Sequence, residues 1–316
     1  MADNQTLLQK ADVAIADVAS GGGVLTTEQS KNFMRKLIDQ PTMIKAARVV
    51  GMNSPTRQIN KIGFGSRILK PGVSATALSS GDRSKPTFTK VDLTAKEVKA
   101  EVRIPYDVME DTIERAAAAT NEASNTGPGG LRQTILDLIA ERAALDLEEL
   151  ALLGDTGSGD AYLALMNGYI KLADTNGNIN DVAGAVVSKT VFKNAKKALP
   201  TKYLRDIKAM KHYVSHNQET DYRDTLADRG TAMGDSYIQG YNPVMAYGSP
   251  VDPVALMPNA KGLFTNPLNL IFGVWRQISL EFDKDITSGV YIIVLSARIA
   301  VEIEEAEAIV ETKNLG

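Results

Sequence analysis

The residues best suited to metal chemistry are the two histidines, His212 and His216, which lie four positions apart. On a helix this spacing would place both imidazoles on one face, where they could bind zinc. The residues around His212 are typical of a strand, and four positions along a strand separate two side chains by more than about 12 Å. The HExxH motif of zinc hydrolases is absent. We therefore expect both histidines to be surface or interface residues and to bind no metal.

A calcium loop is the next candidate, because segment 174–181 is rich in Asp and Asn. An EF-hand loop has glycine at its sixth position and glutamate at its twelfth, whereas this segment has glycine at the fourth and Ala185 at the twelfth. Asn-Gly is also a preferred dipeptide for a tight hairpin turn. We therefore predict a hairpin over 168–183 with Asn176-Gly177 at its turn, and no calcium site.

No combination of residues predicts an enzyme. The glycine-rich segment 154–159 follows a predicted helix rather than a strand and lacks the Gly-Lys-Ser/Thr of a phosphate loop, so it is typical of a helix end. There is no GxSxG motif, and adjacent carboxylates such as Glu304 and Glu305 are typical of a solvated face. We predict no catalytic, cofactor-binding or metal-binding residue, and no cofactor.

The composition is that of a globular protein. The chain has 316 residues, of which 44% are hydrophobic, so it can bury a sizeable core. It has no cysteine, which excludes disulfides, thiolate metal sites and a cysteine nucleophile. The formal net charge of −3 does not indicate overall affinity for nucleic acid. The longest strongly apolar run, Val290 to Leu295, is far too short to cross a bilayer, so we expect no membrane partner.

Charge is concentrated in two segments of opposite sign. Residues 40–81 contain six basic residues and no acid, and residues 301–311 contain five glutamates and no base. Two solvated faces would explain this pattern, and a nucleic-acid surface is a weaker alternative because aromatic residues are not paired there. We prefer complementary surfaces that meet between copies of the chain. The predicted inter-subunit interface residues are Arg57, Lys61, Arg67, Lys70, Glu302, Glu304 and Glu305.

The first third of the chain predicts an arm and a ribbon. Amphipathic helices are expected over 5–18 and 26–38, and a strand over 43–50. Two strand-like segments, 57–69 and 87–104, flank small and polar residues and predict a long two-stranded excursion. The apolar positions change from odd to even numbers at Lys96-Glu97, which predicts a bulge or bend. Because an isolated ribbon is marginally stable in water, it must lie on its own domain or on a neighbouring subunit.

The rest of the chain alternates helices and strands. The strongest helix is 131–153, with an apolar stripe that includes Leu147 and Leu150, and with its solvated face marked by three acids. The acids are Asp137, Glu141 and Glu148. A mixed block from 165 to 280 follows, and the alternation over 297–303 predicts a strand. Shorter elements are expected as helices over 107–119, 189–199 and 217–226, and as a strand over 209–215.

This order of elements resembles the major capsid proteins of tailed bacteriophages, which have the α+β Hong Kong-97 capsid fold. The resemblance covers nearly the whole chain. It is carried by the glycine-marked helix exit 150–157 with Gly168 after it, by Gly248-Ser249-Pro250-Val251, and by the strand 297–303. It implies a helical arm and entry to the P-domain at 1–54, an E-loop at 55–92, a P-domain at 93–164 with spine helix 131–153, an A-domain at 165–282, and a C-terminal strand returning to the P-domain at 283–316.

The resemblance implies a shell protein. Copies would form the hexamers and pentamers of an icosahedral phage head, assembled in the host cytoplasm, that encloses double-stranded DNA without sequence-specific binding. A portal protein is an implied partner. Only about two dozen residues precede the arm, so we expect a separate scaffolding protein or none. The alternatives are an encapsulin-like nanocompartment shell with protein cargo, which the basic ribbon disfavours, and a soluble α/β enzyme.

Overall fold

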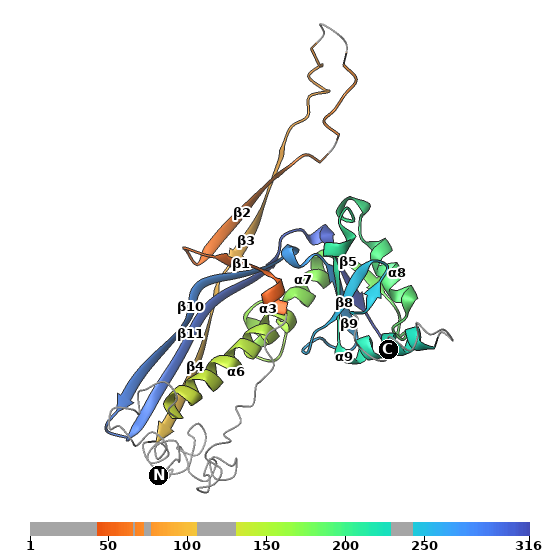
Figure 1. Cartoon of the computed structure of the whole chain (residues 1–316). Helices are drawn as coiled ribbons and strands as arrows, with labels where there is room; N and C mark the ends of the chain where they lie inside the picture. Colours follow the sequence, from red (N-terminus) through yellow and green to blue (C-terminus); the bar gives the residue numbers. More distant parts are fainter. Residues whose placement is uncertain (1–42, 66, 73–76, 106–130, 229–242) are drawn as a thin grey trace.

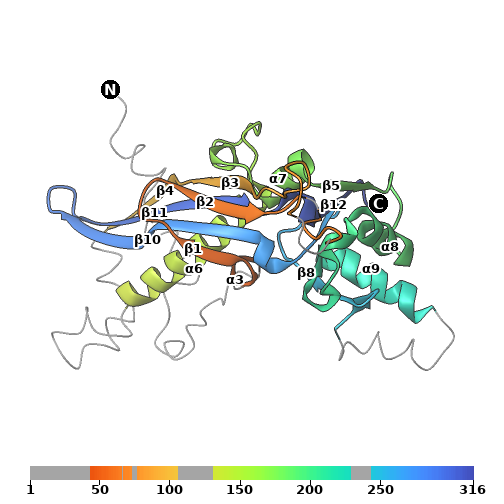
Figure 2. The same ribbon diagram turned by 90° about the horizontal axis from the view of Figure 1, so that it is seen from above.

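The structure, a computed structural model, describes residues 43–65, 67–72, 77–105, 131–228 and 243–316. The helices expected over 5–18, 26–38 and 107–119 lie outside this part. Figure 1 shows an elongated layer of long strands with one long helix, a compact unit at one end of it, and a two-stranded ribbon that projects from the layer. Figure 2 shows the strands of the elongated layer side by side, with the compact unit beyond them.

The elongated layer is a four-stranded sheet in the order β1-β10-β11-β4, in which only β1 is parallel to its neighbour. Its elements are α3 (Met43–Ala46), β1 (Arg48–Gly51), β4 (Lys96–Pro105), α6 (Leu131–Leu153), β10 (Leu270–Asp285) and β11 (Val290–Ile303). The predicted alternation in β11 is confirmed, because Ala297, Ile299 and Val301 are buried in one core with Leu147 and Leu150 of α6. Residue Ala300 belongs to a separate cluster on the ribbon side.

The long helix α6 has the predicted bounds, but the prediction for one acid of its solvated face was wrong. Glu148 is only 3% exposed, and its Oε1 accepts a hydrogen bond from the amide of Met43, 105 positions away. Met43 opens α3, and the first amides of a helix have no partner within the helix. Glu148 therefore anchors the start of α3 to α6. The strand expected from residue 43 begins only at Arg48.

The compact unit is built on a six-stranded sheet in the order β5-β12-β9-β6-β8-β7. Its elements are α7 (Tyr169–Asn176), β5 (Asn178–Asp181), α8 (Lys189–Ala198), β6 (Lys211–Val214), α9 (His216–Ala227), β7 (Met245–Ala246), β8 (Ser249–Pro253), β9 (Lys261–Thr265) and β12 (Ile309–Lys313). Val214 packs with Phe192 of α8 and Tyr222 of α9, whereas Tyr213 and Leu263 share a core with α7. The sheet is thus covered by helices on both faces.

The hairpin predicted over 168–183 is wrong, because α7 occupies the first half of this segment. Asn176 ends the helix, and the amide of Gly177 donates to the carbonyl of Ala173. Gly177 has negative φ, so no left-handed turn requires it. A Cβ there would lie 2.7 Å from the oxygen of Ala173 and 2.9 Å from Cγ2 of Ile309. The glycine therefore serves close packing between α7 and β12.

The strand pairing also departs from the domain boundaries that we expected. β10 was expected mainly in the block 165–282, but it pairs with β1 and β11 in the elongated layer. The segment 283–316 was expected to return to that layer, which β11 does, but β12 goes on to pair with β5 and β9 in the compact unit. The residue types of β10 and β12 did not show which of the two sheets each strand would join.

Two glycines let the end of α6 meet the start of α7 through the backbone. The amide of Gly168 donates to the carbonyl of Gly154 at 2.8 Å. A Cβ at Gly154 would lie 2.4 Å from the oxygen of Met166, and one at Gly168 would lie 2.8 Å from the oxygen of Ala151. Side chains are therefore excluded at both positions, and this close approach joins the elongated layer to the compact unit.

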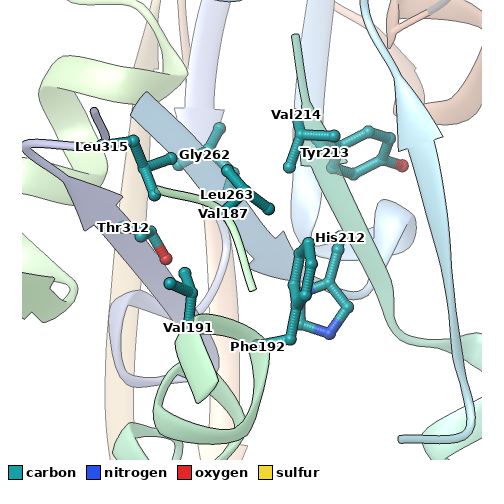
Figure 3. A pocket seen from close by; sticks show the side chains of 10 residues that line it. All are labelled: Val187, Val191, Phe192, His212, Tyr213, Val214, Gly262, Leu263, Thr312 and Leu315. Carbon is teal, nitrogen blue, oxygen red and sulfur yellow. The ribbon is translucent and has the colours of Figure 1, made fainter. Parts of the chain in front are cut away.

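A narrow pocket lies between α8 and the six-stranded sheet (Figure 3). His212 lines this pocket and is buried, contrary to the surface or interface position that we expected. Its ring stacks on Phe264 with ring centroids 4.1 Å apart, and Phe192 contacts it edge-on. Its Nε2 has no hydrogen-bond partner among the described residues. The pocket is lined by Val187, Val191, Phe192, His212, Tyr213, Val214, Gly262, Leu263, Thr312 and Leu315.

Because of His212, we expect the folded subunit to lose stability as the pH falls below 6.5. Burial lowers the pKa of His212 from 6.5 to about 3, with the charge of Lys196 as a smaller cause. Below pH 6.5 the unfolded chain binds a proton that the folded protein excludes, so this stability is full above that value and declines with acid. The expected loss is about 2 kcal/mol at pH 5, measured by urea unfolding across this range.

The control for this prediction is the second histidine. His212→Phe should remove this part of the pH dependence, whereas His216→Gln should keep it, because His216 is exposed at the start of α9. An unchanged slope in the His212→Phe variant would contradict the prediction.

Candidate assembly interface

The ribbon consists of β2 (Thr56–Gly63) and β3 (Thr87–Thr94), which pair with each other and with no other strand of the described chain. β3 is followed directly by β4, which pairs with β11. The expected change of surface near Lys96 is confirmed, because the two strands separated by Ala95 belong to different sheets. One continuous segment therefore serves first the ribbon and then the elongated layer.

The base of the ribbon rests on its own subunit. Leu93 is buried in a cluster with Met52, Ile271 and Ala300. A Cβ at Gly273 would lie 2.9 Å from Sδ of Met52 and 3.2 Å from Cβ of Ala300, so this glycine allows the close contact. The hydrophobic contact that anchors the ribbon thus lies in the half nearest the elongated layer, where Ile59 also packs against the cluster.

The far half of the ribbon carries an exposed apolar pair on the face away from this base. Ile62 and Phe88 lie directly opposite each other in the register, and each is 69% exposed. Side chains alternate along a strand, so the buried Leu93 and its partner Arg57 point to the other face. Further exposed apolar residues continue toward the tip, namely Phe64, Ile68, Leu69 and Leu78. We call Ile62 and Phe88 the apolar face of the ribbon.

The two oppositely charged segments meet within one subunit along the ribbon, from Arg48 before it to Lys61 in β2. Nζ of Lys61 lies 3.1 Å from Oε2 of Glu305 and also donates to the carbonyl of Glu304. Arg48 forms a 2.8 Å ion pair with Glu304. The guanidinium of Arg57 donates to the carbonyl of Gly51. These contacts hold the ribbon at a defined angle to its own layer, so the charge complementarity expected between copies exists inside the chain.

The other predicted interface residues are spread from the ribbon tip to β11. Arg67 is exposed and its side chain has no partner among the described residues, whereas Lys70 lies 3.6 Å from Asp82. The hydrogen bond from Ser79, together with the charge of Lys70, lowers the pKa of Asp82. At the other end, burial raises the pKa of Glu302, which lies on β11. The structure therefore groups Lys61 with Glu304 and Glu305 and leaves Arg67 apart.

A charge exchange tests the contact between Lys61 and Glu305. Lys61→Glu should lower the free energy of unfolding by about 1 kcal/mol or less, because the ion pair is partly exposed. Adding Glu305→Lys should restore most of the loss. Urea unfolding of the two single variants and the double variant measures the coupling, and strictly additive effects would contradict a direct interaction.

The described residues offer little else of chemical interest. No group of three or more His, Asp or Glu side chains among them is arranged to hold a metal ion. No helix in the same part of the chain is both long and apolar enough to span a membrane.

Sequence reasoning missed the apolar face of the ribbon. Its signal was present as Ile62 and Phe88 within polar surroundings, but only the strand register shows that Ile62 and Phe88 share a face.

Comparison with known proteins agrees with this architecture. No family model matches the chain. The chain is 38% identical over 318 residues to a Bacillus subtilis (strain 168) protein named "Putative prophage capsid protein YqbE", and the alignment covers 97% of each. The chain belongs to the capsid protein family of phages and prophages. Its relatives are structural proteins, and no enzymatic activity is indicated for this capsid protein.

Solved structures show that this capsid protein has the Hong Kong-97 fold. The satellite phage P4 procapsid, which includes the size determination (Sid) protein, has a chain with a TM-score of 0.63 and 14% identity, covering 99% of this chain and 96% of the other. The capsid of the native GTA particle has a chain with a TM-score of 0.63 and 15% identity, covering 96% and 99%. The expected α+β class and capsid fold are thereby confirmed, and the protein is a component of the virion shell.

Proposed function

We propose that this capsid protein assembles into hexamers and pentamers that close into an icosahedral head around double-stranded DNA. The observation that carries the proposal is the apolar face of the ribbon, where Ile62 and Phe88 are each 69% exposed. Burying a large apolar side chain contributes about 1.5–3 kcal/mol, and a two-stranded ribbon is marginal alone. Every assembled subunit contacts a neighbouring copy, and that copy can cover the exposed apolar side chains. The ribbon therefore lies across the surface of the neighbouring copy.

The seven charged residues predicted for the interface have two proposed roles. Arg67 and Lys70, in the segment that joins β2 to β3, contact the neighbouring copy directly. The others set the angle of the ribbon to its own layer, through the contacts of Lys61 with Glu304 and Glu305. This second group is Arg57, Lys61, Glu302, Glu304 and Glu305. The resulting interfaces are of the obligate class, burying about 2,000 Å² or more.

The remaining partners follow from the shell. In the proposal the expected division into arm, E-loop, P-domain and A-domain is kept, with β10 counted in the P-domain and β12 in the A-domain. Assembly takes place in the host cytoplasm, with a portal protein at one vertex and a separate scaffolding protein or none. The net charge of −3 favours enclosing DNA without gripping it tightly, because phosphate contacts require basic residues.

Electron microscopy of the purified protein tests the proposal. Expressed alone or with its neighbouring phage genes, the protein should form closed particles with five-fold and six-fold clusters. Particles made during infection and treated with nuclease should retain double-stranded DNA. A persistent monomer would contradict the shell, and particles filled with a cargo protein instead of DNA would contradict the phage head.

A further inference from the structure

One helix of the compact unit carries a row of lysines on its solvent side. Lys189, Lys193 and Lys197 are spaced four apart on α8, so they form one stripe, and all three are exposed. The opposite side of the helix buries Val191 and Phe192. None of the three lysines has an ion-pair partner among the described residues. We call these three residues the lysine stripe.

The neighbouring helix carries the opposite charge. Asp221 and Asp224 of α9 and Asp228 at its C-terminal cap are spaced three and four apart, and all three are exposed. None of their carboxylates pairs with another described residue, whereas Glu219 pairs with Arg223. We call Asp221, Asp224 and Asp228 the aspartate stripe.

The stripes weaken the subunit that carries them. Like charges one turn apart repel each other along a helix. The helix dipole disfavours Lys189 at the start of α8 and Asp228 after the end of α9, whereas it favours Lys197 in the last turn of α8. The two helices pack through Phe192 and Tyr222, with ring centroids 4.7 Å apart, so both stripes stay outside their shared core. Within the part of the chain that the structure describes, no residue of the same subunit pairs with either stripe.

We infer that the lysine stripe of one copy contacts the aspartate stripe of the next copy around the ring. This inference rests on the proposed assembly into hexamers and pentamers. α8 and α9 lie side by side in the compact unit, on the side away from the β10–β11 hairpin (Figures 1 and 2). A second copy supplies a complement to both stripes at once, in a head-to-tail contact that closes into a ring. A polyanion would complement α8 but be repelled by the adjacent aspartates.

Charge reversal of each stripe tests the contact in the full-length protein. One variant replaces Lys189, Lys193 and Lys197 by Glu, and the other replaces Asp221, Asp224 and Asp228 by Lys. Each should lower the fraction of protein in particles by roughly tenfold or more at low salt, because like charges then face each other. A variant with all six replacements should assemble again. Sedimentation measures the particle fraction, and circular dichroism checks that each variant is folded.

Mixing the two triple variants gives a sharper result. The first has two acidic stripes and the second has two basic stripes, so they can only alternate around a ring. Alternation closes a hexamer but not a pentamer. The mixture should therefore form six-membered rings, visible in tubes or sheets by electron microscopy, and no closed heads.

The outcomes separate this inference from the proposed function. If the unmodified protein forms no particles, the proposed function fails. If it forms particles and the folded lysine-stripe variant does so equally well, the inference fails alone, and loss of DNA from those particles would assign the stripe to nucleic acid. The inference would also be overturned if the variant with all six replacements folds but fails to assemble.

Discussion

Replacing Ile62 and Phe88 together by glutamate is expected to abolish shell assembly while leaving the subunit folded. Both side chains are largely exposed in the subunit, so the free energy of unfolding should change by less than about 1 kcal/mol. In the proposed shell each contributes about 1.5–3 kcal/mol by burial on the neighbour, and glutamate would add the cost of burying a charge. Assembly should therefore fall by at least roughly a hundredfold at equal protein concentration.

The matched control uses the other face of the same ribbon. Thr87 is exposed and precedes Phe88, so Thr87→Glu adds a carboxylate on the opposite side of the ribbon and leaves Thr89, which lies opposite Lys61, unchanged. This control should retain much more assembly than the Ile62 and Phe88 variant. Light scattering and electron microscopy measure particle formation, and thermal unfolding checks the subunit. Normal heads from the Ile62 and Phe88 variant would show that the apolar face has no neighbour to bury it.

Gly154→Ala is expected to destabilise the subunit by about 3–5 kcal/mol, the upper range for a single substitution. The added Cβ would lie 2.4 Å from the oxygen of Met166 and 2.6 Å from that of Leu150, and both are backbone atoms that cannot rotate away. Gly168→Ala should act in the same direction, because its Cβ meets the oxygen of Ala151 at 2.8 Å. Either substitution would force the end of α6 and the start of α7 to move apart.

The loop that follows provides the control for these glycines. A Cβ at Gly159 meets nothing within 4 Å, so Gly159→Ala should change the free energy of unfolding by less than about 0.5 kcal/mol. Urea unfolding measures all three variants. A Gly154→Ala protein as stable as the Gly159→Ala protein would show that the backbone contact is not required.

Elements with strong local patterns could be predicted from the sequence. The apolar stripe of α6 and the alternating apolar residues of β11 meet in one core, and periodicity alone located both elements. The change of face near Lys96 also predicted the division between β3 and β4. These signals come from neighbours in the chain, and they hold wherever the segment packs.

Features set by distant residues could not be predicted. Gly177 was taken as a turn residue, but contact with Ile309 determines its role. Glu148 has the charge of a surface residue and is buried because Met43 needs a hydrogen-bond acceptor. At the candidate interface, the opposite charges of Lys61 and Glu305 were recognised, yet nothing in the sequence showed that they meet in one subunit. The pairing of Ile62 with Phe88 required the strand register as well.

The position of β12 has a consequence for how the protein is made. β12 lies between β5 and β9 in the interior of the six-stranded sheet, although both partners precede it in the chain. The sheet therefore stays open until residues 309–313 have left the ribosome. At about 5–20 residues per second, that is roughly 10–40 s after the ribbon strands have been translated. The compact unit is thus completed only after the elongated layer and the ribbon have been translated, so the ribbon leaves the ribosome before its own subunit is fully folded.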